Sequence, residues 1–340
     1  MNITGTLLLV YNSCVMDNQI NQQDMPKEKK SWKKMALKIA TSAVLLTIIF
    51  TRVDTAELIE NIRLLDYRYA IFVPLFIIVH YFIGGVRWKM LLLSEDSREI
   101  ETKYLINLYF IGSFFNNFMP TSVGGDVYKM YQLGKKMKNN AVGFSSTFME
   151  RFTGMASLVL ISYFGLIKTM SFWLSLLPKE ILSNSFLVFL FKLSLFSGFW
   201  VLAIIGFVSL NFLAKKISIF KKVRDSLWAY KDAKKALFVA FLTSFLIQAL
   251  SILPQYFVFL ALGLEVPFTF ALFILPVITF AGFFIPSLNG FGVQDALYMS
   301  FLSMVGVSGS LALSASILYH FSRLLASLIG GVLYALGKGD

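Results

Sequence analysis

Two similar stretches, one in each half of the sequence, decide the fold of this chain. Residues 110–126 read FIGSFFNNFMPTSVGGD, and residues 280–295 read FAGFFIPSLNGFGVQD. Each is an apolar arm that reaches a proline, passes a glycine-containing turn and ends at an acidic residue. Proline and glycine break helices, and the second arms are shorter than the about 20 residues that a helix needs to cross a bilayer. Each stretch is predicted to form a helical hairpin, with these residues at its turn: Pro120, Gly124, Gly125, Pro286, Gly290 and Gly292.

The composition places these hairpins in a membrane protein. Of the 340 residues, 57% are hydrophobic and only 15% are charged, whereas a soluble domain has about 25% charged residues. The apolar residues form long blocks, which we interpret as spanning helices because a helix satisfies its own backbone polar groups in lipid. We therefore predict an all-α polytopic membrane protein with spans in residues 35–51, 69–93, 145–170, 185–213, 236–262 and 311–336.

The basic residues predict the orientation of these spans. Lysine and arginine cluster in the tail before residue 35, in residues 129–138 and in residues 214–235, whereas residues 263–310 contain neither. Cytoplasmic loops carry the excess of lysine and arginine. Both termini are therefore expected in the cytoplasm, and residues 52–68 and 263–310 outside. This distribution accounts for the net charge of +12, so no nucleic-acid partner is expected.

With this orientation the first hairpin begins and ends inside, and the second begins and ends outside. We predict an inverted repeat of three spans plus a re-entrant helical hairpin in each half, an arrangement typical of transporters. The alternative is an ordinary pair of spans joined by a tight loop in each place. The predicted divisions are a flexible basic tail (1–34), a first membrane repeat (35–170), an external linker (171–184) and a second membrane repeat (185–336).

Two arginines, Arg151 and Arg323, lie inside predicted spans. A charge there costs about 2.5–3.5 kcal/mol on insertion scales and faces the protein interior or a cavity. Asp126 and Asp295 follow the two turns, where an acid can cap the second arm. One interpretation is a polar cavity in which the arginines bind a lipid phosphate and the aspartates pair with them or with a basic headgroup. The other is a structural Asp–Arg pair that locks each hairpin against its span.

Four further residues complete the candidate headgroup site: Asn117, Lys129 and Gln294 in the hairpin segments, and Arg87 near the inner end of the second span. His80 and His320 lie within spans, and we expect hydrogen-bonded packing roles for them rather than a proton relay, because no chain of acidic residues accompanies them. The single cysteine, Cys14, and the two histidines argue against a cysteine- or histidine-based metal site. No catalytic residue, metal or cofactor is predicted.

At these residues the chain resembles the lysylphosphatidylglycerol synthase transmembrane-region family, also called the flippase-like domain family. The resemblance covers nearly all of residues 35–336. The matching pieces are Arg87-Trp88, Asn117-Phe118-Met119-Pro120, Gly124-Gly125-Asp126, Glu150-Arg151, Pro286, Gly290-Phe291-Gly292-Val293-Gln294-Asp295 and Arg323.

The resemblance implies that the protein moves phospholipids or lipid-linked headgroups between the leaflets of the cell inner (plasma) membrane. In bifunctional members a cytoplasmic synthetase domain transfers lysine from charged tRNA to phosphatidylglycerol. We expect this chain, which ends at Asp340, to lack that domain.

Two other functions remain open. The first is a membrane subunit or accessory of aminoacyl-phospholipid, glycolipid or hopanoid synthesis, and the second is a membrane scaffold that transports nothing. No hydrolase triad, P-loop, dinucleotide fingerprint or metal-ligand spacing occurs in the sequence, so a transporter is favoured over an enzyme. The expected partners are membrane phospholipids or lipid-linked intermediates, with the enzymes that make them as further candidates.

Overall fold

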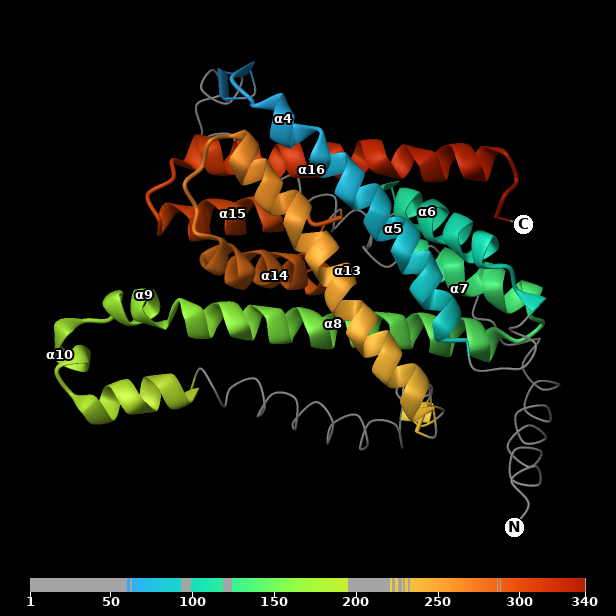
Figure 1. The fold of residues 1–340 in the computed structure, drawn as a ribbon, viewed down its shortest axis with the longest axis horizontal. Helices are drawn as coiled ribbons and strands as arrows, with labels where there is room; N and C mark the ends of the chain where they lie inside the picture. Colours follow the sequence, from blue (N-terminus) through green and yellow to red (C-terminus); the bar gives the residue numbers. More distant parts are fainter. Residues whose placement is uncertain are drawn as a thin grey trace, which may run out of the picture. The chain divides into compact units, whose positions relative to one another are not determined.

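The structure is a computed structural model, and all of its regular secondary structure in the described residues is helical (Figure 1). It describes residues 60–61, 63–92, 99–118, 124–194, 221, 224–225, 228, 230–231, 233–285, 287 and 289–339. The labelled helices are α4 (Tyr67–Ala70), α5 (Phe72–Met90), α6 (Thr102–Phe118), α7 (Gly124–Lys136), α8 (Asn140–Lys168), α9 (Met170–Ser175), α10 (Lys179–Leu182), α13 (Lys234–Ala261), α14 (Phe268–Phe284), α15 (Val293–Ser303) and α16 (Gly309–Ala335). All of them belong to one compact unit, Lys38–Asp340.

Four of the six predicted spans coincide with long helices. Three stretches are both long and apolar enough to cross a membrane: Tyr67–Met90, Lys234–Ala261 and Gly309–Ala335. Helix α8 has 29 residues, about 43 Å at 1.5 Å per residue, although Glu150 and Arg151 interrupt its apolar sequence. The prediction of a helical membrane protein is confirmed. The predicted span 35–51 lies outside the described residues, and of 185–213 only the apolar helix Ser185–Ser194 is described.

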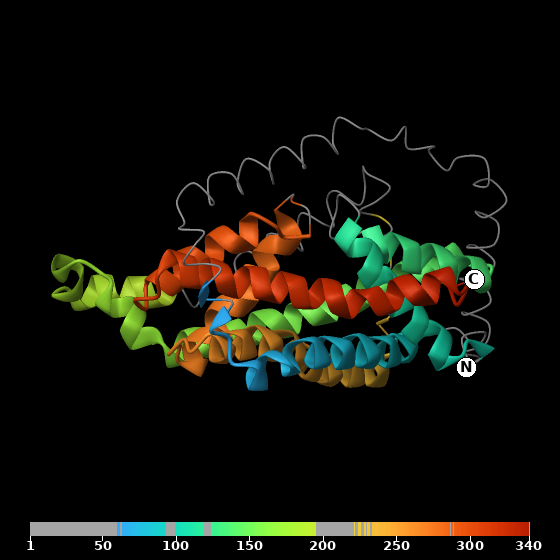
Figure 2. The ribbon, with the colours of Figure 1, turned by 90° about the horizontal axis from the view of Figure 1, so that it is seen from above.

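The two predicted hairpins are pairs of shorter helices, α6 with α7 and α14 with α15. The first arms have 17 residues each and the second arms 13 and 11, so the second arms are about 20 Å and about 17 Å long and cannot cross a hydrocarbon core of about 30 Å. In Figures 1 and 2 the α6–α7 pair lies where α5 ends and α8 begins, and the α14–α15 pair lies at the opposite end, where α13 ends and α16 begins.

The tips of the two hairpins touch. Asn117 lies at the end of α6, and its Oδ1 accepts a hydrogen bond from Nδ2 of Asn289 in the second turn. This turn has the left-handed backbone that glycine favours: φ is +47° at Asn289, +91° at Gly290 and +81° at Gly292. The predicted glycine turn is therefore present in the second hairpin. Pro120 and Pro286 lie outside the described residues.

The prediction for the glycines of the first hairpin was wrong in one respect. Gly124 and Gly125 lie in the first turn of α7 rather than in the loop before it. A methyl group on Gly125 would overlap the carbonyl oxygen of Gly112 on α6. The Gly125 N–H donates to Oδ1 of Asn116 (2.7 Å). Gly125 therefore lets the two arms approach closely, a role that the turn interpretation did not include.

The long helix of each half packs against the hairpin of the other half. Helix α16 runs along α6, and α8 runs along α14, while α5 and α13 lie side by side (Figure 1). Each long helix has a glycine at its crossing: a Cβ on Gly330 would overlap the carbonyl of Phe110, and a Cβ on Gly165 would lie 2.6 Å from the backbone nitrogen of Phe273. Small residues at such crossings let backbones approach closely in membrane proteins.

Candidate functional site

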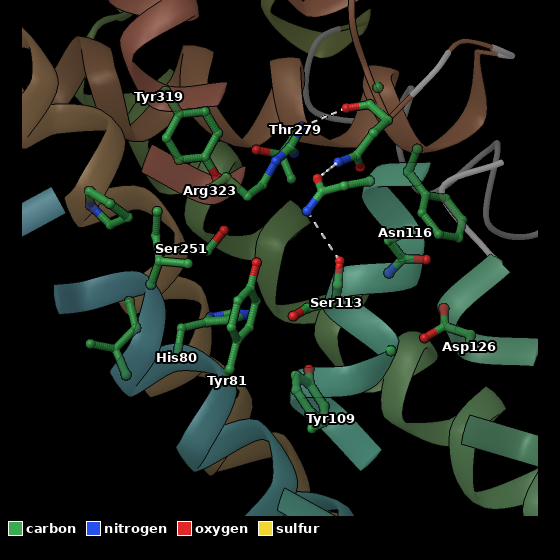
Figure 3. Close-up of a pocket in the computed structure, with 18 of the residues that line it drawn as sticks. His80, Tyr81, Tyr109, Ser113, Asn116, Asp126, Ser251, Thr279, Tyr319 and Arg323 are labelled. Carbon is green, nitrogen blue, oxygen red and sulfur yellow. Dashed lines mark hydrogen bonds between the residues drawn. The ribbon is translucent and has the colours of Figure 1, made fainter. Parts of the chain in front are cut away.

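A cavity of about 190 Å³ lies where the hairpin tips meet. Helices α5, α6, α7, α8, α13, α14, α15 and α16 all contribute side chains to its wall. In Figure 3 the side chains of Arg323, Thr279, Ser113 and Tyr81 point toward this common space. Six of the predicted headgroup residues line the cavity: Asn117, Asp126, Lys129, Arg151, Gln294 and Arg323. The other two, Arg87 and Asp295, do not line it.

On the side of the first hairpin, Arg151 and Asp126 form a two-pronged ion pair. Nε of Arg151 donates to Oδ2 of Asp126 (2.7 Å), and Nη2 donates to Oδ1 (2.8 Å). Lys129, one turn along α7, places its Nζ 3.1 Å from Asp126 Oδ1. The pair that the sequence suggested is therefore present, and it joins helices α7 and α8. Two parallel charged hydrogen bonds fix the direction of the guanidinium as well as its distance.

Behind this pair, Glu150 is the centre of a buried charge network. Its Oε1 accepts from the Tyr109 hydroxyl (2.8 Å) and from Arg87 Nη2 (3.4 Å), and its Oε2 accepts from Lys129 Nζ (3.1 Å). Arg87 also donates to Ser244 Oγ on α13 (2.6 Å). Glu150 directly precedes Arg151 in the sequence but was not among the predicted site residues. The signal was available, since a buried acid within a span is as costly as a buried base.

This network has one more positive than negative charge. Its cations are Arg87, Lys129 and Arg151, and its carboxylates are Asp126 and Glu150. The side chain of Arg151 is 36% exposed, whereas the other four are at most 3% exposed. The excess positive charge of this network therefore faces the cavity at Arg151.

On the side of the second hairpin, the acid and the arginine do not touch. Asp295 caps α15, accepting from the N–H of Gly292 (2.7 Å) through Oδ2 and from the Ser316 hydroxyl through Oδ1. Nε2 of His320 lies 3.2 Å from Oδ1 of Asp295. Arg323 lies beyond the histidine, and its Nη2 donates to the Asn289 carbonyl (2.6 Å) and to His320 Nδ1 (3.0 Å). An imidazole thus separates the two charges that the sequence suggested as a pair.

Arg323 therefore lacks the kind of partner that Arg151 has. Among the residues that the structure describes, no carboxylate lies within 4.0 Å of its guanidinium, and its buried Nε has no hydrogen-bond partner.

A family model described as the lysylphosphatidylglycerol synthase TM region matches residues 35–331.

The chain belongs to this family. The family resemblance that the residues suggested is confirmed, and the chain is a multi-pass membrane protein of the lysylphosphatidylglycerol synthase TM-region family.

Two relatives are UPF0104 membrane proteins. The one from Pyrococcus horikoshii is 22% identical over 327 residues, which cover 88% of this chain and 96% of the relative. The one from Methanothermobacter thermautotrophicus is 25% identical over 313 residues, which cover 84% of this chain and 89% of the relative. No solved structure matches the chain.

In this member of the lysylphosphatidylglycerol synthase TM-region family, amides line the cavity between the two arginines. Asn117 donates through Nδ2 to Ser327 Oγ on α16 (2.6 Å). Gln294 packs against Gly282, where a methyl group would overlap its amide. Its buried Oε1 has no partner among the described residues. The cavity thus offers an acceptor as well as cationic donors.

His80 also lines the cavity, and its surroundings differ from those of His320. Its Nδ1 lies 3.1 Å from the carbonyl of Ile247 on α13, and no carboxylate among the described residues is within ion-pair distance. No group of three or more potential metal ligands occurs in the part of the chain that the structure describes. The donor set of the cavity, mainly guanidinium, ammonium and amide groups, suits an anion.

Proposed function

We propose that this protein moves a phospholipid, or another lipid with a phosphate-linked headgroup, between the two leaflets of the cell inner membrane. The headgroup occupies the cavity, and the acyl chains remain in the bilayer. One observation carries the proposal: the arginines of the two halves line a single cavity, and Arg323 has no acidic partner among the described residues. Guanidinium groups match the geometry of phosphate oxygens and bind them through paired hydrogen bonds.

The charges around the cavity support an anionic lipid. The cations Arg87, Lys129, Arg151 and Arg323 outnumber the carboxylates Asp126, Glu150 and Asp295 by one, with the histidines neutral. An unbalanced charge at membrane depth is costly. A phosphodiester contributes a single negative charge, which offsets this excess as long as the histidines stay neutral. A zwitterionic headgroup brings a second, positive charge that has no free carboxylate to meet it among the described residues.

The proposal includes the membrane arrangement of the two halves. We place α6–α7 as a re-entrant hairpin entering from the cytoplasm and α14–α15 as one entering from outside, so that the halves form an inverted repeat. The short second arms, the contact between the tips and the basic residues at 129–138 and 214–235 support this placement. A site between hairpins that enter from opposite faces can open to each leaflet in turn.

The test is lipid translocation by the purified protein in liposomes. Phosphatidylglycerol with a fluorescent headgroup is added in trace amounts, and a membrane-impermeant reductant quenches only the outer-leaflet label. We expect wild-type protein to expose the inner-leaflet label as well. Arg323→Gln should slow this exposure roughly tenfold to a hundredfold, because a charge-assisted hydrogen bond contributes about 1.5–3 kcal/mol.

Arg323→Gln suits this test because it leaves no described carboxylate unpaired. The matched control is Arg63→Gln, since Arg63 is 74% exposed and lies outside the cavity. Wild-type translocation in an Arg151→Gln, Arg323→Gln double variant would exclude the proposed site. Binding of phosphatidylglycerol without translocation would favour the alternative function, a headgroup-binding subunit of lipid synthesis.

A further inference from the structure

Asp295, His320 and Arg323 form a continuous chain from a buried acid to the cavity. Asp295 is held by the N–H of Gly292 and by the Ser316 hydroxyl, so its position is fixed. His320 is only 3% exposed and lies with its ring 4.1 Å from that of Phe291, in a stacked orientation. Arg323 is the member of the chain that lines the cavity. Among the described residues, the imidazole thus lies between a fixed carboxylate and a guanidinium that faces the proposed ligand.

We infer that His320 is a proton-binding site coupled to anion binding at Arg323. The inference rests on the proposed function, because it uses the anion that the cavity is proposed to hold. The sequence alone favoured a packing role for His320, since no acidic residues accompany it along α16. The fold supplies the acid from the neighbouring helix α15.

The hydrogen bond from Arg323 indicates the tautomer of His320 in this arrangement. Nη2 of Arg323 donates to Nδ1 of His320, so the Nδ1 lone pair is occupied and that nitrogen cannot also hold a proton. The remaining proton of a neutral imidazole is then on Nε2, which lies 3.2 Å from the Asp295 carboxylate. In this arrangement a neutral His320 lies between two opposite charges, those of Asp295 and Arg323.

An anion in the cavity changes this balance. It draws the Arg323 guanidinium toward itself, and the Nδ1 lone pair of His320 becomes free. A proton from cavity water then binds Nδ1, and the imidazolium is stabilised by Asp295. No covalent bond of the lipid forms or breaks, and the anion and the proton enter together with no net change in charge.

The groups around His320 favour protonation only when the anion is present. On α15 it faces Asp295, and Tyr298 further along that helix donates its hydroxyl to Gln255. On α16 it faces Arg323, beside Tyr319. Arg323 opposes a positive imidazole and Asp295 favours it, so neutralising the arginine shifts the balance toward the proton. By linkage, the proton must favour the anion to the same extent.

The test measures binding of phosphatidylglycerol to the full chain in phosphatidylcholine nanodiscs between about pH 5 and pH 8, the range in which histidine titrates. The phosphodiester keeps its charge throughout this range. We expect the affinity to rise as the pH falls, by up to about tenfold per pH unit for one coupled proton. His320→Gln should make the affinity independent of pH.

His80→Gln is the matched control. The chain has two histidines, and His80 lines the same cavity without a carboxylate at ion-pair distance among the described residues. This variant should keep the pH dependence, whatever its affinity. Binding that does not vary with pH in the wild type, or a pH dependence that survives His320→Gln, would overturn the proton site while leaving the proposed function intact.

A second measurement uses only the wild-type protein, so it does not depend on whether a variant folds. Phosphatidylglycerol added to wild-type protein in weakly buffered solution should cause net proton uptake near neutral pH, of at most one proton per protein. Binding without uptake at any pH in the histidine range would overturn the inference. Absence of phosphatidylglycerol binding at every pH would instead overturn the proposed function, so the two failures are distinguishable.

Discussion

Glu150 has a structural importance that its place in the sequence does not suggest. It is 1% exposed and joins three helices, through Arg87 on α5, Tyr109 on α6 and Lys129 on α7. Buried ion pairs give little net stability, because desolvation offsets their attraction, but removal of one partner leaves an uncompensated charge. Glu150 is therefore the acid that two buried cations share, and among the described residues it is the carboxylate at ion-pair distance from Arg87.

Glu150→Ala should lower the free energy of unfolding by about 3–5 kcal/mol, because Arg87 and Lys129 would remain buried without their shared acid. Thermal unfolding of the purified protein in detergent measures the change. Glu180→Ala is the control, since Glu180 is an exposed acid of α10. The double variant Lys129→Met, Glu150→Gln should lose less stability than Glu150→Ala. An unchanged melting temperature in Glu150→Ala would contradict the role of the network.

The sequence predicted the first half of the site better than the second. Arg151 was recognised as a costly membrane charge and Asp126 as a candidate partner for it, and the two form a direct pair. The same argument suggested Asp295 for Arg323, but His320 lies between them. Spacing along a chain does not reveal which residue occupies the space between two helices, because that depends on how α15 and α16 cross.

At the scale of elements, the helix crossings depend on glycines that have no role in turns. Gly330 lies in the middle of a buried contact, where α16 passes over the backbone of α6. Most of the attraction between membrane helices comes from close packing, because lipid provides no hydrophobic driving force between them. The position of α16 therefore depends on the absence of a side chain at this residue.

Gly330→Ala should destabilise the protein by about 1–3 kcal/mol, the usual cost of overpacking, because the new methyl group would overlap the Phe110 carbonyl. The melting temperature in detergent reports the change. Gly309→Ala is the matched control on the same helix, since only the flexible tip of Met299 lies near its Cβ position. Equal melting temperatures for the two variants would show that α16 can shift away from α6 at no cost.

The apolar blocks of the sequence located the long helices, because every segment that crosses lipid must satisfy its own backbone polar groups. The predicted blocks 145–170, 236–262 and 311–336 agree with α8, α13 and α16 to within about five residues at each end. The role of Gly125 was misjudged because glycine permits both turns and close contacts. A sequence pattern cannot distinguish these two uses until the opposite backbone is known.

At the scale of the whole molecule, the two halves are proposed to have opposite orientations in the membrane. This arrangement can be tested through single cysteines in a Cys14→Ser background, because Cys14 is the only cysteine of the chain. Lys135 lies at the end of α7 and Ser303 at the end of α15, and both are exposed. A membrane-impermeant maleimide should label Ser303→Cys in intact cells and Lys135→Cys only after permeabilisation, in keeping with the distribution of basic residues.

Permeabilised cells provide the control, since both cysteines should then react to the same extent. Labelling of both from the same side in intact cells would mean that the hairpins enter from one face. That result would remove the basis for a site that opens to each leaflet in turn.

The crossing of each long helix over the other half's hairpin has a consequence for biogenesis. A ribosome makes α6 well before α16, the helix that covers it. Until then, the face of α6 that includes Phe110 contacts lipid or an insertion chaperone in place of α16. We therefore expect the packing of the first hairpin to be completed only when α16 reaches α6, and not on insertion of the first half.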